Sequence, residues 1–486
     1  MTDPGAFALF SGVLLAAVGV GEGLRAGFGW APESTRRVVH AGVGVATALC
    51  PPLFSSPTLV YVLAGLFVAV NAAALRRRWL PAIHGAERPS LGTVLFPAAL
   101  VGALFLCWTL DAGRVYILQT AFLVLGLADP AASLVGMRLR RPGRYTVAGA
   151  AKSVAGSLAF AAVAGVCTAG MLAWLTPWSA GRIAAGALAV AVVGAACEAS
   201  GRRGWDNVLV VLGVVVPLAV LDARPDAAAL VALAVAAGAL FAAAAYRARS
   251  LDLSGALAGG VLAFLLFAAG GAAWAVPSLA FFVASSALSR AGRARKATAE
   301  ARADKGSRRD AAQVAANGGI GAAFLAATLF WPDAAGLLYA GFLGAFAAAA
   351  ADTWATEVGT LAGGPTRRMG LGRPVPPGTS GGVSLAGTLA AAAGASFVAA
   401  CAAPFAPWPV VASVALGGVA GALADTVLGA TAQARYRRAD GTVTERAAEA
   451  GRAHPLAAGL AFVTNDRVNG VCTLAGALVP VLLLSR

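Results

Sequence analysis

Residues 334–359 read AAGLLYAGFLGAFAAAAADTWATEVG, and this stretch decides the fold class. From residue 334 to residue 351 the chain has only apolar residues and glycine, close to the about 20 residues that an α-helix needs to cross a bilayer. The run ends at Asp352, and Glu357 follows shortly after. We therefore expect a membrane-spanning helix with two carboxylates at one end.

The composition of the whole chain indicates many such helices. Of 486 residues, 59% are hydrophobic and 12% are charged, against about 25% charged residues in a typical soluble domain. So few charges exclude a soluble globular protein, and so many apolar residues exclude a disordered one. The short alternating segments that a transmembrane β-barrel requires are not seen. The expected fold class is all-α, a polytopic transmembrane helical bundle.

The apolar runs predict about 16 spans in two related halves. The run at 38–54 is short and fits a re-entrant segment as well as a span, and residues 455–464 predict a short extra element. No basic segment precedes the first run, so we expect a retained membrane helix there and not a cleaved signal peptide. The predicted spans are residues 6–24, 38–54, 57–75, 92–109, 115–136, 153–175, 183–199, 206–221, 228–246, 253–270, 272–289, 314–331, 334–352, 381–402, 408–430 and 469–485.

Basic residues recur in every second loop. The formal net charge is +15, which in a soluble protein indicates nucleic-acid binding. Here the basic residues lie in short loops between spans, so the positive-inside rule explains them and no nucleic-acid partner is expected. The alternation places these loops on the cytoplasmic side of a bacterial inner membrane and both ends of the chain outside. The six cysteines form no CxxC pair and predict neither disulfides nor a zinc site.

Acidic residues gather near the ends of the spans that adjoin the basic loops. A charge at membrane depth costs roughly 2.5–3.5 kcal/mol, so it needs a reason. Carboxylates beside basic loops predict a site for Mg²⁺ and phosphate, because Mg²⁺ prefers one or two carboxylates together with phosphate oxygens. Helix–helix pairing, or a position at the membrane interface, is the alternative for any single acid. The candidates are Glu22, Asp129, Glu198, Asp206, Asp352, Glu357, Asp425 and Asp466.

Two regions look alike and predict an internal repeat. Asp129 lies in GLADPAASLVG and Asp352 in AAADTWATEVG, and in each the seventh residue after Asp is Gly. A basic loop follows, and then small and hydroxyl residues open the next helix, at 152–157 and at 377–382. Gene duplication or fusion explains this order, and coincidence in an Ala/Gly-rich sequence is the alternative. Later in each half come an acid and an Asp/Asn cluster: Glu198 with Asp206 and Asn207, and Asp425 with Asn465, Asp466 and Asn469.

Glycine-rich turns beside these acids are candidates for phosphate binding. Glycines let backbone N–H groups approach a phosphate, and a helix N-terminus favours an anion. The strongest candidate is Gly378-Thr379-Ser380-Gly381-Gly382, beside Arg373, although a flexible turn with close helix packing is the alternative. A Walker A loop is rejected at 143–153, because no Gly precedes Lys152.

Five segments of the first half resemble the dolichol kinase/phytol kinase family of CTP-dependent polyprenol kinases. That family usually shows KSxEGS, with Glu where this chain has Ala155. The matching segments are RRVVHAGVG (36–44), ERPSLGTVLFP (87–97), LADPAASLVGMRLRR (127–141), AKSVAGSLAF (151–160) and CEASGRRGWDNVLV (197–210).

The second half is similar to the phytyl-phosphate kinase-like (DUF92) family of membrane proteins. This match is denser, and a junction between the two halves is predicted at 246–252. The matching segments are SGALAGGVLAF (254–264), FFVASSALSR (281–290), KGSRRDAAQVAANGG (305–319), ADTWATEVG (351–359), GRPVPPGTSGGVSLAG (372–387), ADTVLGATAQ (424–433) and TNDRVNG (464–470).

The two resemblances imply a two-step kinase for isoprenoid salvage. The domain at 1–246 is expected to phosphorylate an alcohol of the phytol, farnesol or geranylgeraniol class, and the domain at 252–486 to convert the monophosphate to the diphosphate. CTP is the implied phosphoryl donor, Mg²⁺ the expected cofactor, and a prenyl alcohol or prenyl phosphate within the membrane lipid the expected substrate.

The residues expected to act divide into acids and phosphate-binding groups. Asp129, Glu198 and Asp206 serve the first site, and Asp352, Glu357 and Asp425 the second, with Asp129, Asp352 and Asp425 as metal ligands. The residues expected to bind substrate or nucleotide are His40, Arg88, Lys152, Ser153, Gly156, Asn207, Arg309, Asn317, Arg373, Gly378, Thr379, Ser380, Gly381, Gly382, Asn465, Asp466 and Asn469.

Three other functions fit parts of the pattern. Many spans with an internal repeat are typical of a transporter, although transporter sites lie near the midplane of the membrane. A cytidylyltransferase that makes a CDP-lipid uses the same site parts and releases pyrophosphate. A scaffold without catalysis is the remaining alternative.

Overall fold

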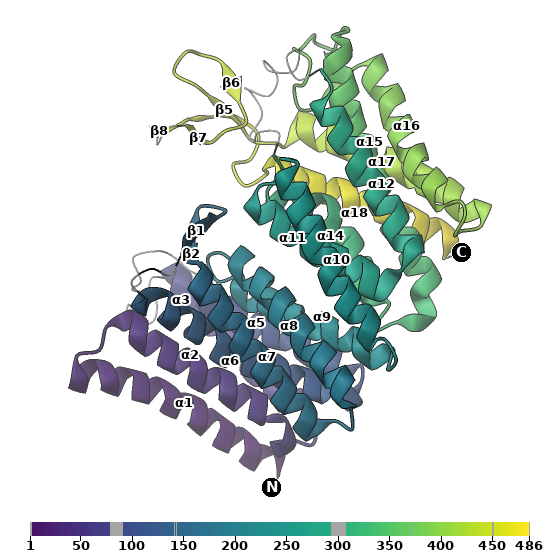
Figure 1. The fold of residues 1–486 in the computed structure, drawn as a ribbon. Helices are drawn as coiled ribbons and strands as arrows, with labels where there is room; N and C mark the ends of the chain where they lie inside the picture. Colours follow the sequence, from purple (N-terminus) through teal and green to yellow (C-terminus); the bar gives the residue numbers. More distant parts are fainter. Residues whose placement is uncertain are drawn as a thin grey trace. The chain divides into compact units, whose positions relative to one another are not determined.

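The structure is a computed structural model, and it describes residues 2–77, 91–139, 141, 143–292, 308–370, 372–449 and 452–485. The chain divides into two compact units, Met1–Ala237 and Gly238–Arg486, and each unit is a bundle of helices (Figure 1). Within the described residues, fourteen helices are long and apolar enough to cross a membrane. The all-α polytopic class predicted from the sequence is confirmed.

Two predicted spans are not among these fourteen helices, and they account for the difference from the 16 spans expected. α2 (Pro32–Leu49) corresponds to the run at 38–54, but it begins in a polar segment that includes Arg36 and Arg37. α14 (Ala311–Ala327) corresponds to the run at 314–331 and is apolar but only 17 residues long.

The first unit is built around a buried central helix, α6. Its face toward α2 carries Gly126, and a Cβ added at Gly44 of α2 would lie 2.4 Å from the Gly126 Cα. The two backbones therefore touch, as small residues allow in membrane helix pairs. In chain order the unit has α1 (Asp3–Phe28), α2, α3 (Thr58–Arg77), α5 (Gly92–Leu104), the π-helical turn η2 (Phe105–Thr109), α6 (Val115–Arg138), β1 (Arg144–Val147), β2 (Ala150–Ser153), α7 (Val154–Leu175), α8 (Ala180–Ser200) and α9 (Asp206–Ala223).

The division between the units falls inside α10 (Ala228–Arg247), earlier than the predicted junction at 246–252. The second part of α10 packs against the second unit. A Cβ at Gly238 would lie 2.6 Å from the Gly260 carbonyl oxygen, and the rings of Phe241 and Phe282 lie 5.1 Å apart. These contacts attach residues 238–247 to the helices that follow.

The second unit surrounds α15 (Ala335–Ala362), whose residues Ala340–Ala351 are all buried. A helix that is apolar on every side needs neighbours on every side, and α15 packs against α12, α14, α16, α17 and α18. In chain order the unit has, after the second part of α10, the elements α11 (Leu253–Leu265), the π-helical turn η4 (Leu266–Gly270), α12 (Ala272–Arg290), α14, α15, β3 (Arg367–Arg368), β4 (Gly382–Val383), α16 (Leu385–Ala402), α17 (Trp408–Thr431), β5 (Arg435–Arg437), β6 (Val443–Thr444), β7 (Ala448–Glu449), β8 (Arg452–Ala453), β9 (Leu456–Ala458) and α18 (Asn465–Leu484).

Short strands occupy the loops, which the all-helical prediction did not include. β1 pairs with β2 and β3 with β4, each as an antiparallel hairpin just before a long helix. Between α17 and α18 a small sheet has the order β6-β5-β9, beside the hairpin β7-β8 (Figure 1). The extra element predicted at 455–464 is strand β9.

Candidate functional site

The first unit contains a buried ion pair between two predicted site residues. Lys152 is the third residue of strand β2, and its Nζ lies 2.5 Å from Glu198 Oε1 and 3.0 Å from the Glu198 carbonyl oxygen. Glu198 lies in the last turns of α8 and is 7% exposed. The hairpin of β1 and β2 therefore places the ammonium group of Lys152 against the end of α8.

Asp129, His40 and Asp206 lie around this pair. His40 of α2 has its Nε2 3.8 Å from Asp129 Oδ2 and 3.2 Å from the Leu125 carbonyl oxygen, both on α6. The charges of Lys152 and of Asp206, which begins α9, act on Asp129. Five elements thus bring predicted site residues together at one place in the first unit.

Three other predicted residues of this unit have structural partners. Ser153 caps α7 by accepting a hydrogen bond from the Gly156 N–H at 3.1 Å. The amide of Asn207 donates to the Gly92 carbonyl oxygen at 3.1 Å and is buried. Arg88 lies outside the described residues.

In the second unit, polar side chains from three central helices meet. Asp352 follows the buried run of α15, Asp425 lies in α17, and each is within electrostatic reach of the other. With its amide turned to donate, Asn469 of α18 lies 3.2 Å from Asp425 Oδ2 and 3.3 Å from the Asn465 carbonyl oxygen. Asn465 Oδ1 in turn lies 3.5 Å from Gln433 Nε2, and the predicted Asp466 follows in the same first turn of α18.

A cation and a further acid lie beside these residues. Glu357 is five residues after Asp352 on α15 and accepts a hydrogen bond from Ser289 Oγ at 2.5 Å. Arg309 precedes α14, and burial lowers the pKa of its guanidinium, while the charges of Glu357 and Asp352 raise it. Arg309 is therefore within electrostatic reach of Glu357 and Asp352, and Asp352 in turn is within reach of Asp425.

The predicted GTSGG turn is used at least partly for packing. The Gly382 N–H donates to the Thr379 carbonyl oxygen at 2.9 Å, and a Cβ at Gly381 would lie 2.3 Å from the Ala430 nitrogen at the end of α17. Gly378 and Gly381 both have positive φ, so glycine is required for the turn. Arg373 is exposed. Phosphate binding by this turn stays a prediction.

The loop between α15 and α16 and the loop between α17 and α18 bring further charges to the same place. Ser380 donates to Glu445, whose charge acts on Asp425. Arg368 donates to the Ala430 carbonyl oxygen. Burial lowers the pKa of Arg435, and the like charge of Arg368 lowers it further. Two arginines thus lie near the turn that was expected to bind phosphate.

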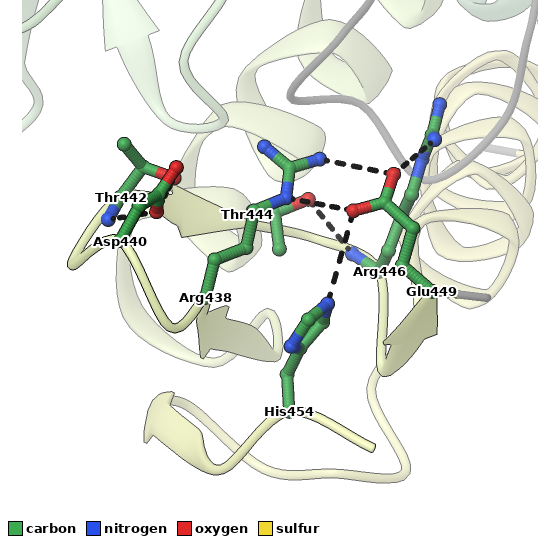
Figure 2. A network of polar contacts seen from close by, with 7 residues as sticks. All are labelled: Arg438, Asp440, Thr442, Thr444, Arg446, Glu449 and His454. Carbon is green, nitrogen blue, oxygen red and sulfur yellow. Dashed lines mark hydrogen bonds and ion pairs between the residues drawn. The ribbon is translucent and has the colours of Figure 1, made fainter. Parts of the chain in front are cut away.

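A polar network fixes this loop (Figure 2). Glu449 accepts from Arg438 Nε at 3.0 Å and from Arg446 Nη1 at 2.9 Å, and His454 Nε2 lies 3.9 Å from Glu449 Oε2. Asp440 closes the tip of the loop by accepting from both the N–H and the hydroxyl of Thr442. Because Glu445 lies between these paired residues, the network determines where Glu445 can reach.

The two units share a helix-capping arrangement. Ser153 caps α7 and Ser384 caps α16, and each hydroxyl accepts from the N–H of the glycine three residues later at 3.1 Å. A Cβ at Gly136 would lie 2.6 Å from Ser153 Oγ, and a Cβ at Gly359 would lie 3.2 Å from Ser384 Oγ. These glycines are the ones that follow the two aspartates of the proposed repeat.

This geometry corrects the repeat as it was aligned from the sequence. The counterpart of Lys152–Ser157 is Val383–Thr388, and not the stretch at 377–382, which forms the turn before β4. The position of Lys152 is therefore occupied by Val383 in the second unit. At this position of the shared capping arrangement the first unit has an ammonium group and the second unit has an apolar side chain.

Several residues near the sites were not predicted from the sequence. Arg37 of α2 is 8% exposed and its charge acts on Asp129, while Arg368, Arg435 and Glu445 reach the second site from loops. In the sequence, Arg37 stands among charged and polar residues, as in an ordinary loop, so nothing there indicates that it is buried. The other three come from segments without hydrophobic periodicity, so their sequence carries no signal of their position.

The carboxylates were expected to bind Mg²⁺. Among the described residues no group of three or more His, Cys, Asp or Glu side chains is arranged to hold a metal ion. The carboxylates of Asp352 and Asp425 offer oxygen ligands. Such a set fits Mg²⁺ in its usual form, held by one or two carboxylates together with substrate phosphates and water.

Comparisons with known proteins match mainly the second unit. Residues 235–477 match the family described as integral membrane protein DUF92. Protein PGR of Arabidopsis thaliana is 36% identical over 213 residues, and the match covers 39% of this chain and 74% of that protein. An uncharacterized membrane protein of Methanocaldococcus jannaschii is 26% identical over 238 residues, 49% of this chain and 87% of that protein. No solved structure matches the chain.

Proposed function

The chain belongs to the DUF92 family of integral membrane proteins, and we propose that it is a CTP-dependent kinase that makes prenyl diphosphates in two steps. The family match begins at residue 235, so it includes the second unit. The polyprenol kinase-like nature of residues 1–234, which precede the family match, is part of the proposal. That the chain is an integral multi-pass membrane protein does not depend on this proposal.

The observation that carries the proposal is the meeting of Asp352, Asp425 and Asn469 in the second unit, with Arg309 and Glu357 beside them. Phosphoryl transfer needs little covalent chemistry from a protein and relies on positioning and on the neutralisation of charge. Carboxylates that can hold Mg²⁺, beside arginines that can hold phosphate, meet this need. Bound Mg²⁺ would neutralise charge on the donor phosphates. The proposal assigns the acceptor phosphate to Arg309 and the nucleotide to Arg368 and Arg435.

The step assigned to the second unit needs no strong base. An oxygen of the prenyl monophosphate forms a bond to the γ-phosphorus of CTP, and the bond from that phosphorus to the bridging oxygen breaks. CDP leaves and the prenyl diphosphate remains. Because the acceptor oxygen is already ionised at neutral pH, orientation by Arg309 is the main requirement.

The first unit is assigned the phosphorylation of the alcohol. Here the acceptor carries a proton, which must leave as its oxygen attacks the γ-phosphorus. The proposal assigns the acceptance of this proton to Asp129, whose Oδ2 lies 3.8 Å from His40 Nε2. Lys152 would bind donor phosphate, and the Glu198 carboxylate holds the ammonium in position. Both sites are proposed to open to the cytoplasm, where the basic loops and the nucleotide are expected.

The test is a product assay with the purified full chain in lipid nanodiscs. The protein receives a prenyl alcohol or the matching monophosphate, Mg²⁺ and each of the four nucleoside triphosphates. The proposal expects monophosphate, then diphosphate, with one CDP released for each phosphate transferred. Release of pyrophosphate with formation of a CDP-lipid would replace the kinase by a cytidylyltransferase. The absence of all phosphorylated products with several chain lengths would overturn the proposal.

A further inference from the structure

A buried arginine of the first unit has no strong acceptor for its hydrogen bonds. Arg37 lies in α2, and its side chain is 8% exposed. Within the described part of the chain, its Nε and Nη1 atoms have no hydrogen-bond partner. A buried donor without an acceptor destabilises a fold, most of all in a charged group, so each one in a native protein needs a reason.

The contacts that Arg37 does make are weak. Its Nη2 donates to the Met137 Sδ at 3.3 Å, and a thioether is a weak acceptor. Glu33 Oε1 lies 3.8 Å from the same Nη2, which is too far for a hydrogen bond. That carboxylate accepts from Arg36 at 2.8 Å and is half exposed. Arg37 is therefore a buried guanidinium that can still accommodate an anion.

The packing of α2 against α6 places Arg37 at the loop end of the site. His40 lies against Leu125 and Asp129 of α6. Arg37, three residues earlier on α2, lies against Met137, close to the end of α6. The two helices are thus antiparallel here. Along α6, Arg37 lies between Asp129 and the loop that follows, and its charge acts on Asp129.

We propose that Arg37 binds the terminal phosphate group that is transferred in the first unit, and that Met137 covers the guanidinium until this phosphate binds. The inference rests on the proposed function, which assigns the proton of the alcohol to Asp129 and donor phosphate to Lys152. The charges of Lys152 and Arg37 both act on Asp129. The same group is the γ-phosphate of CTP before transfer and the phosphate of the prenyl monophosphate after it.

The chemistry of the two side chains favours this ligand. A guanidinium presents five N–H donors in a planar arrangement that matches two phosphate oxygens, and it stays charged. Met137 is 61% exposed, and its unbranched side chain is flexible, so it can move aside without a change in the helix. A phosphate oxygen in place of the thioether would satisfy donors of Arg37 that the described chain leaves without partners.

The first measurement uses the purified full chain in nanodiscs without ligand, with a fluorescent probe in the first unit. Arg37→Met removes a buried charge that has no strong partner, so the midpoint of denaturant unfolding should not fall. Arg138→Met is the matched control, because Arg138 is exposed at the end of α6 and carries the same charge. A clear fall in the Arg37 variant alone would assign Arg37 to folding and overturn the proposal.

The second measurement adds a ligand and follows the same midpoint, which rises with binding to the folded unit. The two sources of a terminal phosphate are β,γ-methylene-CTP with Mg²⁺ and a ten-carbon prenyl monophosphate, and the prenyl alcohol lacks one. Arg37→Met should raise the Kd for at least one phosphate ligand about tenfold or more, and the ligand affected identifies the source. The Kd of the alcohol should not change.

Arg37→Lys keeps the charge without the planar donor arrangement, so it should bind the phosphate ligand more weakly than the unaltered chain and more tightly than Arg37→Met. Arg138→Met should bind as the unaltered chain does. No midpoint shift by either phosphate ligand in the unaltered chain, or the same Kd values in the Arg37→Met variant, would overturn the proposal.

These outcomes are distinct from the fate of the kinase proposal. If no nucleotide yields a phosphorylated product, but a phosphate ligand stabilises the first unit through Arg37, the kinase proposal fails and this inference stands. If Arg37→Met phosphorylates the alcohol with unchanged kcat and KM, the kinase stands and this inference is overturned.

Discussion

Lys152 Nζ lies 2.5 Å from Glu198 Oε1, in a pair whose side chains are 20% and 9% exposed. Removing one member of a buried ion pair leaves the other charge without compensation and typically costs about 3–5 kcal/mol. Lys152→Met should therefore lower the free energy of unfolding of the first unit by about 3 kcal/mol.

The double variant Lys152→Met/Glu198→Gln tests this reason. It should lose clearly less stability than the sum of the two single variants, because no charge is left buried alone. Thermal unfolding in nanodiscs is the measurement, with Arg144→Met as the control, since Arg144 is exposed on the same hairpin. Additive losses in the double variant would contradict a direct pairing. If Lys152 binds phosphate, Lys152→Met should also abolish phosphorylation of the alcohol, and the double variant should not restore it.

Ser153→Ala and Ser384→Ala should have equal effects, because the two serines cap equivalent helices. The loss of an N-cap hydroxyl typically costs about 1 kcal/mol. Each variant should lower the unfolding free energy of its own unit by about that amount, measured by denaturant unfolding with a fluorescent probe in each unit. A loss in one unit only would contradict the shared geometry.

Arg309→Gln should raise KM for the prenyl monophosphate by about tenfold to a hundredfold, because a hydrogen bond to a charged group contributes about 1.5–3 kcal/mol. Phosphorylation of the alcohol should not change. Arg308→Gln is the control, because Arg308 is the exposed neighbouring residue. An unchanged KM in the Arg309 variant would remove Arg309 from the acceptor site.

The loop network predicts a pH dependence. Hydrogen bonds from Arg438 and Arg446 lower the pKa of Glu449 below its usual 4.5. A carboxyl group whose pKa is lowered on folding stabilises the folded loop above its usual pKa, and this stabilisation is lost as the pH falls through the lowered value. Amide exchange of residues 438–449, corrected for the intrinsic rate, should show loss of protection below about pH 4.5.

Glu449→Gln is the control for this pH dependence. Its loop should be less protected at neutral pH and should show no such additional step on acidification. If the unaltered protein and this variant gave the same profile, the network around Glu449 would not be what orders the loop.

The sequence was sufficient to predict the membrane helices and the acids at their ends. Long apolar runs have few alternatives to spanning helices, and an acid directly after such a run, as Asp352, must lie near a helix end. The equivalence of Ser153 and Ser384 was missed because hydroxyl and glycine residues occur both in the turn at 378–382 and in the cap that follows. Only the contacts with Gly136 and Gly359 distinguish the two.

The parts that the sequence did not predict depend on contacts between distant segments. Glu445 belongs to a polar loop without periodicity, and its approach to Ser380 follows from the small sheet and the pairing of Glu449. Arg37 belongs to a helix whose burial follows from the close contact of Gly44 with Gly126.

The most direct test of the account is the fate of a prenyl monophosphate with CTP and Mg²⁺ in the Asp352→Asn variant. The unaltered chain should convert it to the diphosphate, and the variant should do so at least about a hundredfold more slowly, while still converting the alcohol to the monophosphate at the normal rate. Asp333→Asn, in the loop before α15, should behave as the unaltered chain. Equal diphosphate formation by the Asp352 variant would contradict the site assigned to the second unit.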